Sequence, residues 1–402
     1  MNKVMLKRKE EFEMYLIKNA IVYAPQYLGK RDVLVGGGNI LKIGIDLPVE
    51  QSYDVEVIDG TGKVLFPGLI DSHVHILGGG GEGGAKTRTP EIMLSDIIKA
   101  GVTTVVGCLG TDGCTRTMSN LLAKAKGLEE EGITTYVYTG SYQVPVRTIT
   151  GSILDDMILF DRIIGTGEIA ISDHRSSQPT KEEFEKLVSD TRVGGILSAK
   201  AGIVDIHMGD GKRKMELIRS AVEETEIPVS NILPTHINRS KAMMEEGMDY
   251  AKKYGGFIDF TTSFDVKDAS SDGVKASVGL KKALEESVPL EQITFSSDAQ
   301  GSLPIFDSNG VFLRLGVGSI QTLYREMKEA VLVEKISLEK ALFPVTLNPA
   351  TILKLHQKGR ISEGADADLV LAEEETLEID SVFAKGRLMM KQKECVVKGT
   401  FE

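Results

Sequence analysis

The chain has 402 residues, of which 42% are hydrophobic, and a formal net charge of −11. This length predicts one large domain with a smaller one, and the apolar fraction is enough for a sizeable core. The acidic balance argues against nucleic-acid binding and gives no positive patch for a membrane surface. No apolar run approaches the roughly 20 residues that a membrane-spanning helix needs.

Cysteine usage and the N-terminal sequence favour a cytoplasmic location. The three cysteines, Cys108, Cys114 and Cys395, cannot build a disulfide framework, which fits a reducing compartment. The first ten residues run into charge rather than into an apolar segment, so we expect no signal peptide.

Both ends of the chain carry short β-segments. They are predicted at 15–23, 32–35 and 40–43, and again after Leu355 at 367–371, 381–384 and 388–390. We expect the two ends, residues 1–62 and 346–402, to pair into one small flanking β-sandwich.

Between these ends, apolar strands alternate with amphipathic helical stretches. Such alternation predicts a parallel sheet covered by helices, and eight strands predict an α/β fold of the (β/α)8 TIM-like barrel type over residues 63–345. In such barrels the reactive groups gather at the C-terminal ends of the strands. The strands are predicted at 64–70, 103–109, 134–140, 168–172, 204–208, 231–236, 257–262 and 293–297, with helices including 91–100, 120–131, 181–193, 214–224, 241–254 and 280–287.

The most informative motif is His73-Val74-His75, after the first strand. Two histidines at i and i+2 of an extended segment point to the same face, which suits one divalent metal. Taken alone, a His-x-His pair often occurs by chance and binds no metal. Here His207 and His236 also end short apolar strands, which strengthens the prediction of a metal site. Asp298 ends the eighth strand, where it could cap a helix. With four histidines expected at the same rim, a metal ligand and proton acceptor is the favoured interpretation.

Two glycine-rich segments match nucleotide-binding patterns only in part. Residues 78–84 fail the phosphate-loop pattern, because Ala85 separates Gly84 from Lys86. They form either a flexible loop or a substrate-binding loop that offers Glu82 to a cationic group. Residues 165–170 fit the dinucleotide template weakly, but a strand rather than a helix follows the glycines, so a nucleotide site is disfavoured.

Other polar residues carry weaker signals. Tyr142, Arg175 and Arg239 are ordinary surface types, and any functional role follows only from their positions at strand ends. His174 is interpreted as hydrogen-bonded just outside the ligand set. His356 is expected to be structural or exposed, and Cys108 to lie in the core.

The assembled motifs resemble the amidohydrolase superfamily of metal-dependent hydrolases and, within it, the isoaspartyl (β-aspartyl) dipeptidases. The histidine pair with the late Asp298 carries the superfamily resemblance. The glycine-rich loop with Glu82 and the segment 235–239, Thr-His-Ile-Asn-Arg, narrow it to the dipeptidases. The resemblance runs from about residue 15 to the C-terminus and includes the segments 67–75, 78–82, 105–112, 172–176, 207–210, 234–239 and 296–298.

The resemblance implies two zinc ions, although the ligand types alone also admit manganese, cobalt or iron. We expect His73, His75 and Asp298 to hold one ion and His207 and His236 the other. Family members often bridge the ions with a carboxylated lysine; this chain has Glu168 there, and its carboxylate is expected to bridge. The alternative is that Glu168 forms a salt bridge and only one metal binds.

The implied reaction is attack by a hydroxide shared between two ions. Asp298 would take its proton and pass it to the leaving amine, and Tyr142 would stabilise the oxyanion. A β-aspartyl dipeptide carries one free amino group and two free carboxylates. The resemblance implies that Glu82 binds the amine and that Arg175 and Arg239 bind the carboxylates. The other substrate-binding residues that it implies are Gly80, Gly81, Thr111, Tyr142 and Ser302.

Two rival functions stay open. A cyclic-amide hydrolase of the hydantoinase or dihydroorotase type would use the same metals, but its ring substrate lacks the free amine that Glu82 would bind. A non-catalytic assembly protein with this fold would be expected to lose ligand types that this chain has kept. We expect a small-molecule dipeptide substrate, no nucleic-acid or membrane partner, and a homo-oligomer.

Overall fold

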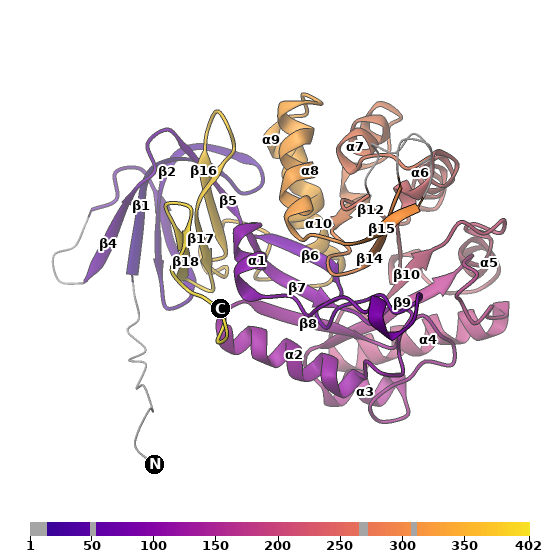
Figure 1. Ribbon diagram of the computed structural model, residues 1–402. Coiled ribbons are helices and arrows are strands. Elements are labelled where there is room, and N and C mark those ends of the chain that lie inside the picture. Colours follow the sequence, from indigo (N-terminus) through magenta and orange to yellow (C-terminus); the bar gives the residue numbers. More distant parts are fainter. Residues whose placement is uncertain (1–13, 49–53, 265–271, 307–311) are drawn as a thin grey trace, which may run out of the picture.

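The computed structural model describes residues 14–48, 54–264, 272–306 and 312–402, and its centre is a parallel barrel (Figure 1). Strands β6 to β11 are hydrogen-bonded in chain order, and β12 pairs with β13. A parallel bridge between Val74 and Ala299 brings the end of the last strand back to the first. The barrel strands are β6 (Leu69–Val74), β7 (Val102–Gly107), β8 (Thr134–Thr139), β9 (Ile163–Ile171), β10 (Ile203–Met208), β11 (Ile232–Thr235), β12 (Ile258–Thr261) and β13 (Ile293–Ser296). The predicted barrel is confirmed.

Helices surround these strands, and several begin at the residues that sequence rules favour. Thr117 and Ser240 cap α2 and α6, and Thr180 forms a capping box with Glu183 at the start of α4. In the described part of the chain, no helix is both long enough and apolar enough to cross a membrane. The longer helices are α1 (Leu94–Lys99), α2 (Met118–Glu131), α3 (Ile153–Leu159), α4 (Lys181–Ser198), α5 (Glu216–Glu224), α6 (Lys241–Tyr254), α7 (Ala276–Glu285), α8 (Gln321–Leu332), α9 (Leu338–Leu342) and α10 (Leu347–Ile352).

The strand predicted at 64–70 is in fact two strands in two different sheets. β5 (Lys63–Pro67) pairs with β1 and β16 in the flanking sheet, whereas β6 starts the barrel at Leu69. The break falls at Gly68, where a Cβ atom would lie 2.4 Å from Oγ1 of Thr103 on β7. Only glycine lets the chain pass this close to its neighbour. The division into residues 1–62 plus 346–402 and 63–345 stays a prediction, with β5 as the passage between the two parts.

The two ends of the chain join in one flanking sheet, as predicted. The rings of Tyr15 on β1 and Phe383 on β17 are 5.2 Å apart, although β5 and β16 separate these strands in the sheet order. Flat strands three positions apart would be roughly 14 Å apart. The sheet therefore folds over itself and encloses a second core. Its other strands are β1 (Met14–Tyr23), β2 (Tyr27–Gly36), β3 (Asn39–Gly44), β4 (Val55–Asp59), β16 (Leu369–Glu373), β17 (Ile379–Ala384), β18 (Arg387–Lys391) and β19 (Glu394–Cys395).

A short antiparallel ribbon follows the barrel. It consists of β14 (Ser302–Phe306) and β15 (Phe312–Val317). Ser302 thus lies at the base of the ribbon, close to the C-terminal end of β13.

Two helical glycines should respond to alanine in opposite ways. In α4, a Cβ atom on Gly195 would lie 2.4 Å from Cα of Gly202, the residue that leads into β10. Gly195→Ala should therefore lower the free energy of unfolding by ~1–3 kcal/mol. In α2, Gly127 has open space around it. Gly127→Ala should therefore raise the free energy of unfolding by about 0.5–1 kcal/mol. Urea unfolding of both variants checks this; equal effects would contradict the close contact between α4 and β10.

Candidate active site

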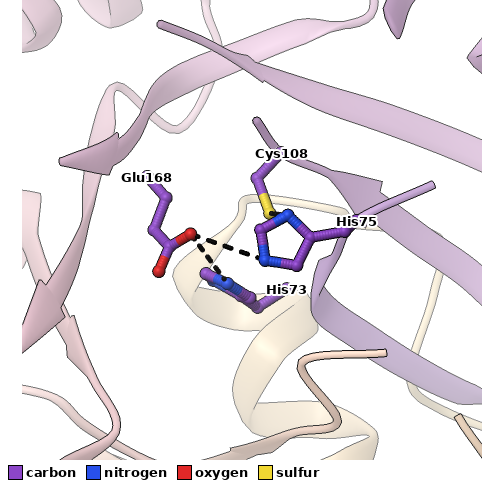
Figure 2. Close-up of side chains that lie close together, drawn as sticks. All are labelled: His73, His75, Cys108 and Glu168. Atoms are coloured by element: carbon purple, nitrogen blue, oxygen red, sulfur yellow. Dashed lines mark hydrogen bonds and ion pairs between the residues drawn. The ribbon is translucent and has the colours of Figure 1, made fainter. Parts of the chain in front are cut away.

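Six side chains from five strands converge at the C-terminal end of the barrel. His73 is the penultimate residue of β6 and His75 follows that strand, and His207 lies on β10. His236 comes directly after β11, and Asp298 lies two residues after β13. Glu168 lies on β9 at their centre, and Figure 2 shows its carboxylate facing His73 and His75. All of the predicted ligands therefore meet at one place.

The two oxygens of Glu168 face two different pairs of histidines. Oε2 lies 3.5 Å from Nε2 of His73 and 3.6 Å from Nε2 of His75. Oε1 lies 2.6 Å from Nδ1 of His207 and 3.3 Å from Nε2 of His236. Asp298 joins the first pair, since its Oδ1 lies 3.1 Å from Nε2 of His75. Each oxygen of this carboxylate is thus close to one pair of imidazoles, an arrangement that could hold two cations.

Unsatisfied buried atoms show that these residues fit divalent ions. Nε2 of His73, Oε2 of Glu168 and Oδ1 of Asp298 are buried without a hydrogen-bond partner among the described residues. An unpaired buried carboxylate oxygen is costly, whereas a cation between these atoms would satisfy all three. Two sets of possible ligand atoms each lie within 4.8 Å of one another: His73, His75, Cys108 and Glu168, and Glu168, His207 and His236.

Protonation at neutral pH also fits a metal site. Burial opposes the ionisation of Glu168, but His73 and His207 outweigh it and hold the pKa of Glu168 well below its usual range. Burial lowers the pKa of His236 to about 3, so its ring is neutral. For His73, burial is outweighed by the negative charge of Cys108, Asp205 and Glu168, which raises its pKa well above 6.5. A bound cation would displace that proton.

Partners behind the ligands orient three of the histidine rings. Nδ1 of His73 lies 2.8 Å from Oδ2 of Asp205, and Nδ1 of His236 lies 2.6 Å from Oγ1 of Thr261. Each contact leaves Nε2 of the ring directed at Glu168, as is usual for metal-binding histidines. Cys108, predicted as core, is buried and also lies behind His75, with Sγ 3.7 Å from Nδ1.

Asp205 and Thr261 were missed in the sequence. The available signal was Asp205 itself, because it lies two residues before His207 in an otherwise apolar strand and so shares its face.

Two glycines explain how Glu168 reaches the centre. The strand predicted at 168–172 is longer and runs over Ile163–Ile171. A Cβ atom on Gly165 would lie 2.2 Å from the carbonyl oxygen of Ile203, and one on Gly167 would lie 2.8 Å from Cβ of Asp205. These glycines therefore let β9 pack closely against β10, rather than ending the strand or binding a nucleotide.

The predicted substrate residues gather on one side of the metal ligands. Oγ1 of Thr111 donates to Oε1 of Glu82 at 2.9 Å, and Nη1 of Arg175 donates to the same oxygen at 3.3 Å. Nη2 of Arg175 donates to Oδ2 of Asp173 at 2.8 Å, and its guanidinium lies over the ring of Tyr142. Through Glu82, the glycine-rich loop is thus hydrogen-bonded to residues that follow β7 and β9.

Tyr142 and two glycines complete this side of the site. The hydroxyl of Tyr142 is buried and lies 2.9 Å from Nδ1 of His207. Gly80 and Gly81 both have positive φ, and a Cβ atom on Gly80 would lie 2.5 Å from the carbonyl oxygen of Thr87 and 3.2 Å from Cβ of Ser302. Gly80 and Ser302 are therefore neighbours.

Arg239 reaches the rim near His236. Its guanidinium lies 5.7 Å from the ring centroid of Phe264, and that ring lies 6.0 Å from the ring of His236. His174 does not form the hydrogen bond expected of it, because its side chain is exposed and its Nδ1 is 3.6 Å from Oδ1 of Asp173. His356 is exposed.

Comparisons with known proteins agree with this geometry. The profile of the amidohydrolase family matches residues 64–389. A crystal structure of the β-aspartyl dipeptidase of Fervidobacterium islandicum AW-1, in complex with a β-Asp-Leu dipeptide, is 48% identical, with a TM-score of 0.87 over 95% of this chain and 98% of that chain. A second structure of that dipeptidase is 46% identical, with a TM-score of 0.85 over the same shares. The allantoinase of Enterococcus faecalis is 27% identical over 89% of this chain and 86% of its own. The chain therefore belongs to the amidohydrolase family, is a hydrolytic enzyme, and groups within that family with the β-aspartyl dipeptidases.

Proposed function

We propose that this enzyme hydrolyses isoaspartyl (β-aspartyl) dipeptides with the help of two divalent ions, most simply zinc. The observation that carries the proposal is the group of Glu82, Thr111 and Arg175, which lies beside His207 because Nη2 of Arg175 is 3.2 Å from Nε2 of that ring. It places an anion and a cation within reach of the metal ligands. The relative that is 48% identical binds a β-Asp-Leu dipeptide, which supports the same substrate class.

The charges of the site match those of the substrate. Glu82 and Arg175 pair with each other in the structure. On binding, the substrate amine would replace Arg175 at Glu82, and a substrate carboxylate would take the place of Glu82 at Arg175. Arg239, which lies near His236, would bind the second carboxylate. Charge-assisted hydrogen bonds of this kind are about twice as strong as neutral ones.

The metals would lie on the two sides of Glu168. His73, His75 and Asp298 would hold one ion and His207 and His236 the other, with Glu168 between them. Bound there, the ions would lower the pKa of a water molecule and polarise the scissile carbonyl.

Asp298 and Tyr142 have distinct parts in the proposed reaction. Oδ1 of Asp298, which has no hydrogen-bond partner among the described residues and lies 3.1 Å from Nε2 of His75, would accept the proton of the attacking water and deliver it to the leaving amine. Burial raises the pKa of Tyr142 well above its usual value, so its hydroxyl keeps the proton. It would donate that hydrogen bond to the oxygen on which negative charge develops.

The second candidate function is hydrolysis of a cyclic amide. The likeness to an allantoinase favours it, but such rings offer no free amine to Glu82. We do not propose a non-catalytic assembly role, because the chain is an enzyme of the amidohydrolase family. We further propose a cytoplasmic location and a homo-oligomeric state, as expected from the sequence.

A substrate panel separates the two candidates. Metal-loaded enzyme should cleave β-Asp-Leu and leave α-Asp-Leu, hydantoin and dihydroorotate nearly untouched, with kcat/KM as the measured quantity. The α-linked dipeptide is the matched control, since it has the same atoms with a different linkage. Faster turnover of a cyclic amide would overturn the dipeptidase proposal.

Asp298→Asn should fold, bind substrate and lose ~10²–10⁴-fold in kcat, because the amide cannot accept the proton of water. Steady-state kinetics on protein of measured metal content checks this. Turnover near that of the wild type, at full metal occupancy, would refute the assigned role.

Arg239→Met should raise KM for β-Asp-Leu by roughly 10- to 100-fold, because a charged hydrogen bond to one substrate carboxylate is lost. Arg219→Met is the matched control, since Arg219 pairs with Glu246 on the outer helices. If both variants keep the KM of the wild type, Arg239 is merely structural.

Glu168→Ala should reduce the bound metal from two ions toward one and depress kcat, as measured by elemental analysis alongside kinetics. Glu82→Gln is the control, because it should weaken substrate binding while keeping both ions. Since a glutamate bridge needs no carbon dioxide, metal-stripped wild type should regain equal activity with and without bicarbonate. A strong bicarbonate requirement, or two tightly held ions in Glu168→Ala, would count against the bridge.

A further inference from the structure

Every barrel strand except β12 contributes a residue to the proposed metal or substrate site near or after its C-terminal end. Thr261 ends β12, but its hydroxyl is taken by Nδ1 of His236 at 2.6 Å. Phe264 follows three residues later, and its side chain is partly buried. Binding sites for small molecules are lined mainly by apolar and aromatic side chains, with a few polar groups that fix the orientation of the ligand. A large apolar ring at this rim is therefore a candidate for contact with the apolar part of a substrate.

Hydrogen bonds fix the backbone that leads into Phe264. Oδ1 of Asn238 accepts from the backbone N–H of Thr261 at 2.7 Å, and Nδ2 of Asn238 donates to the carbonyl oxygen of Thr261 at 2.9 Å. Asn238 is buried and lies between His236 and Arg239 in the chain. The end of β12 is therefore held against the short segment that carries both a metal ligand and a substrate-binding arginine.

The ring of Phe264 is next to both of these side chains. Its centroid is 6.0 Å from that of the His236 ring, and the guanidinium of Arg239 lies over it at 5.7 Å. A cation at this distance over an aromatic face is attracted to the ring. Phe264 thus helps to set the position of Arg239, and it places apolar surface beside the metal ligands.

The charges of the site indicate which part of the substrate meets this ring, a step that rests on the proposed function. Oε1 of Glu82 and Nη1 of Arg175 are 3.3 Å apart. They therefore suit an amino group and a carboxylate bonded to one carbon atom, as in the aspartyl part of a β-aspartyl dipeptide. Arg239 is then left for the carboxylate of the leaving residue. The side chain of the leaving residue is bonded to the same carbon as that carboxylate, so it must lie close to Arg239 and to Phe264.

We propose that Phe264 is a specificity-determining residue that forms the apolar wall of the subsite for the side chain of the leaving residue. With its carboxylate at Arg239, the leaving residue lays its side chain against the ring. An aliphatic side chain and the ring then remove apolar surface from water together, which favours substrates of this kind. A leaving glycine has no side chain and gains nothing from the ring. The enzyme should therefore prefer β-aspartyl dipeptides whose second residue is aliphatic.

The test measures the ratio of kcat/KM for β-Asp-Leu to kcat/KM for β-Asp-Gly. Any movement of Arg239 affects both dipeptides, so it cancels in this ratio. The wild type should show a ratio of at least about 5, and Phe264→Ala should lower it about 5- to 30-fold, because the loss of an apolar group from a pocket typically costs on the order of 10-fold or more. Phe264→Leu keeps an apolar side chain and should retain the ratio within about threefold.

Leu315→Ala is the control for apolar surface on the ribbon that follows the barrel. Leu315 is 40% exposed on β15, and its replacement should leave the ratio unchanged. Circular dichroism and elemental analysis of each variant check that the fold and the metal content are those of the wild type.

The outcomes separate this inference from the proposed function. A wild type that cleaves both dipeptides equally well would overturn the subsite with no variant needed, and so would a Phe264→Ala enzyme that is active and keeps the ratio of the wild type. Either result would leave the dipeptidase function intact. A metal-loaded wild type that cleaves neither dipeptide would overturn both the function and the subsite.

Discussion

One buried carboxylate, Glu168, sets the arrangement of the whole site. Its two oxygens face two pairs of imidazoles that come from three different strands, β6, β10 and β11. Burial opposes its negative charge, so the charge persists only because positive groups surround it. Oε2 of Glu168 has no hydrogen-bond partner among the described residues. It is directed at a place where a cation would satisfy it. The residues at this centre therefore fit a divalent cation.

The backbone around Glu168 is adapted to this position. A glutamate side chain is short, so the strand must come close to the four histidines for its carboxylate to reach them. Gly165 and Gly167 let β9 approach β10 at distances that no Cβ atom would permit. Asp205, the residue that Gly167 faces, also holds the ring of His73. One close contact between two strands therefore positions both the carboxylate of Glu168 and the ring of His73.

The strand-end rule explains why much of the site could be predicted from the sequence. Parallel strands end at one rim, so His73, His75, His207, His236 and Asp298 had to meet there once the barrel was recognised. Contacts across strands were harder, because the pairing of His236 with Thr261 depends on side-chain directions that no local pattern encodes. The contact between Glu82 and Arg175 depends on a loop that folds back over the rim. The split at Gly68 was hidden because both halves of the run are apolar.

The most direct measurement is a crystal structure of the metal-loaded enzyme with anomalous difference maps at the edge of the bound metal. The account predicts two peaks, one among His73, His75 and Asp298 and the other beside His207 and His236, with one oxygen of Glu168 on each. A single peak, or two peaks with Glu168 bound to neither or to only one, would contradict it.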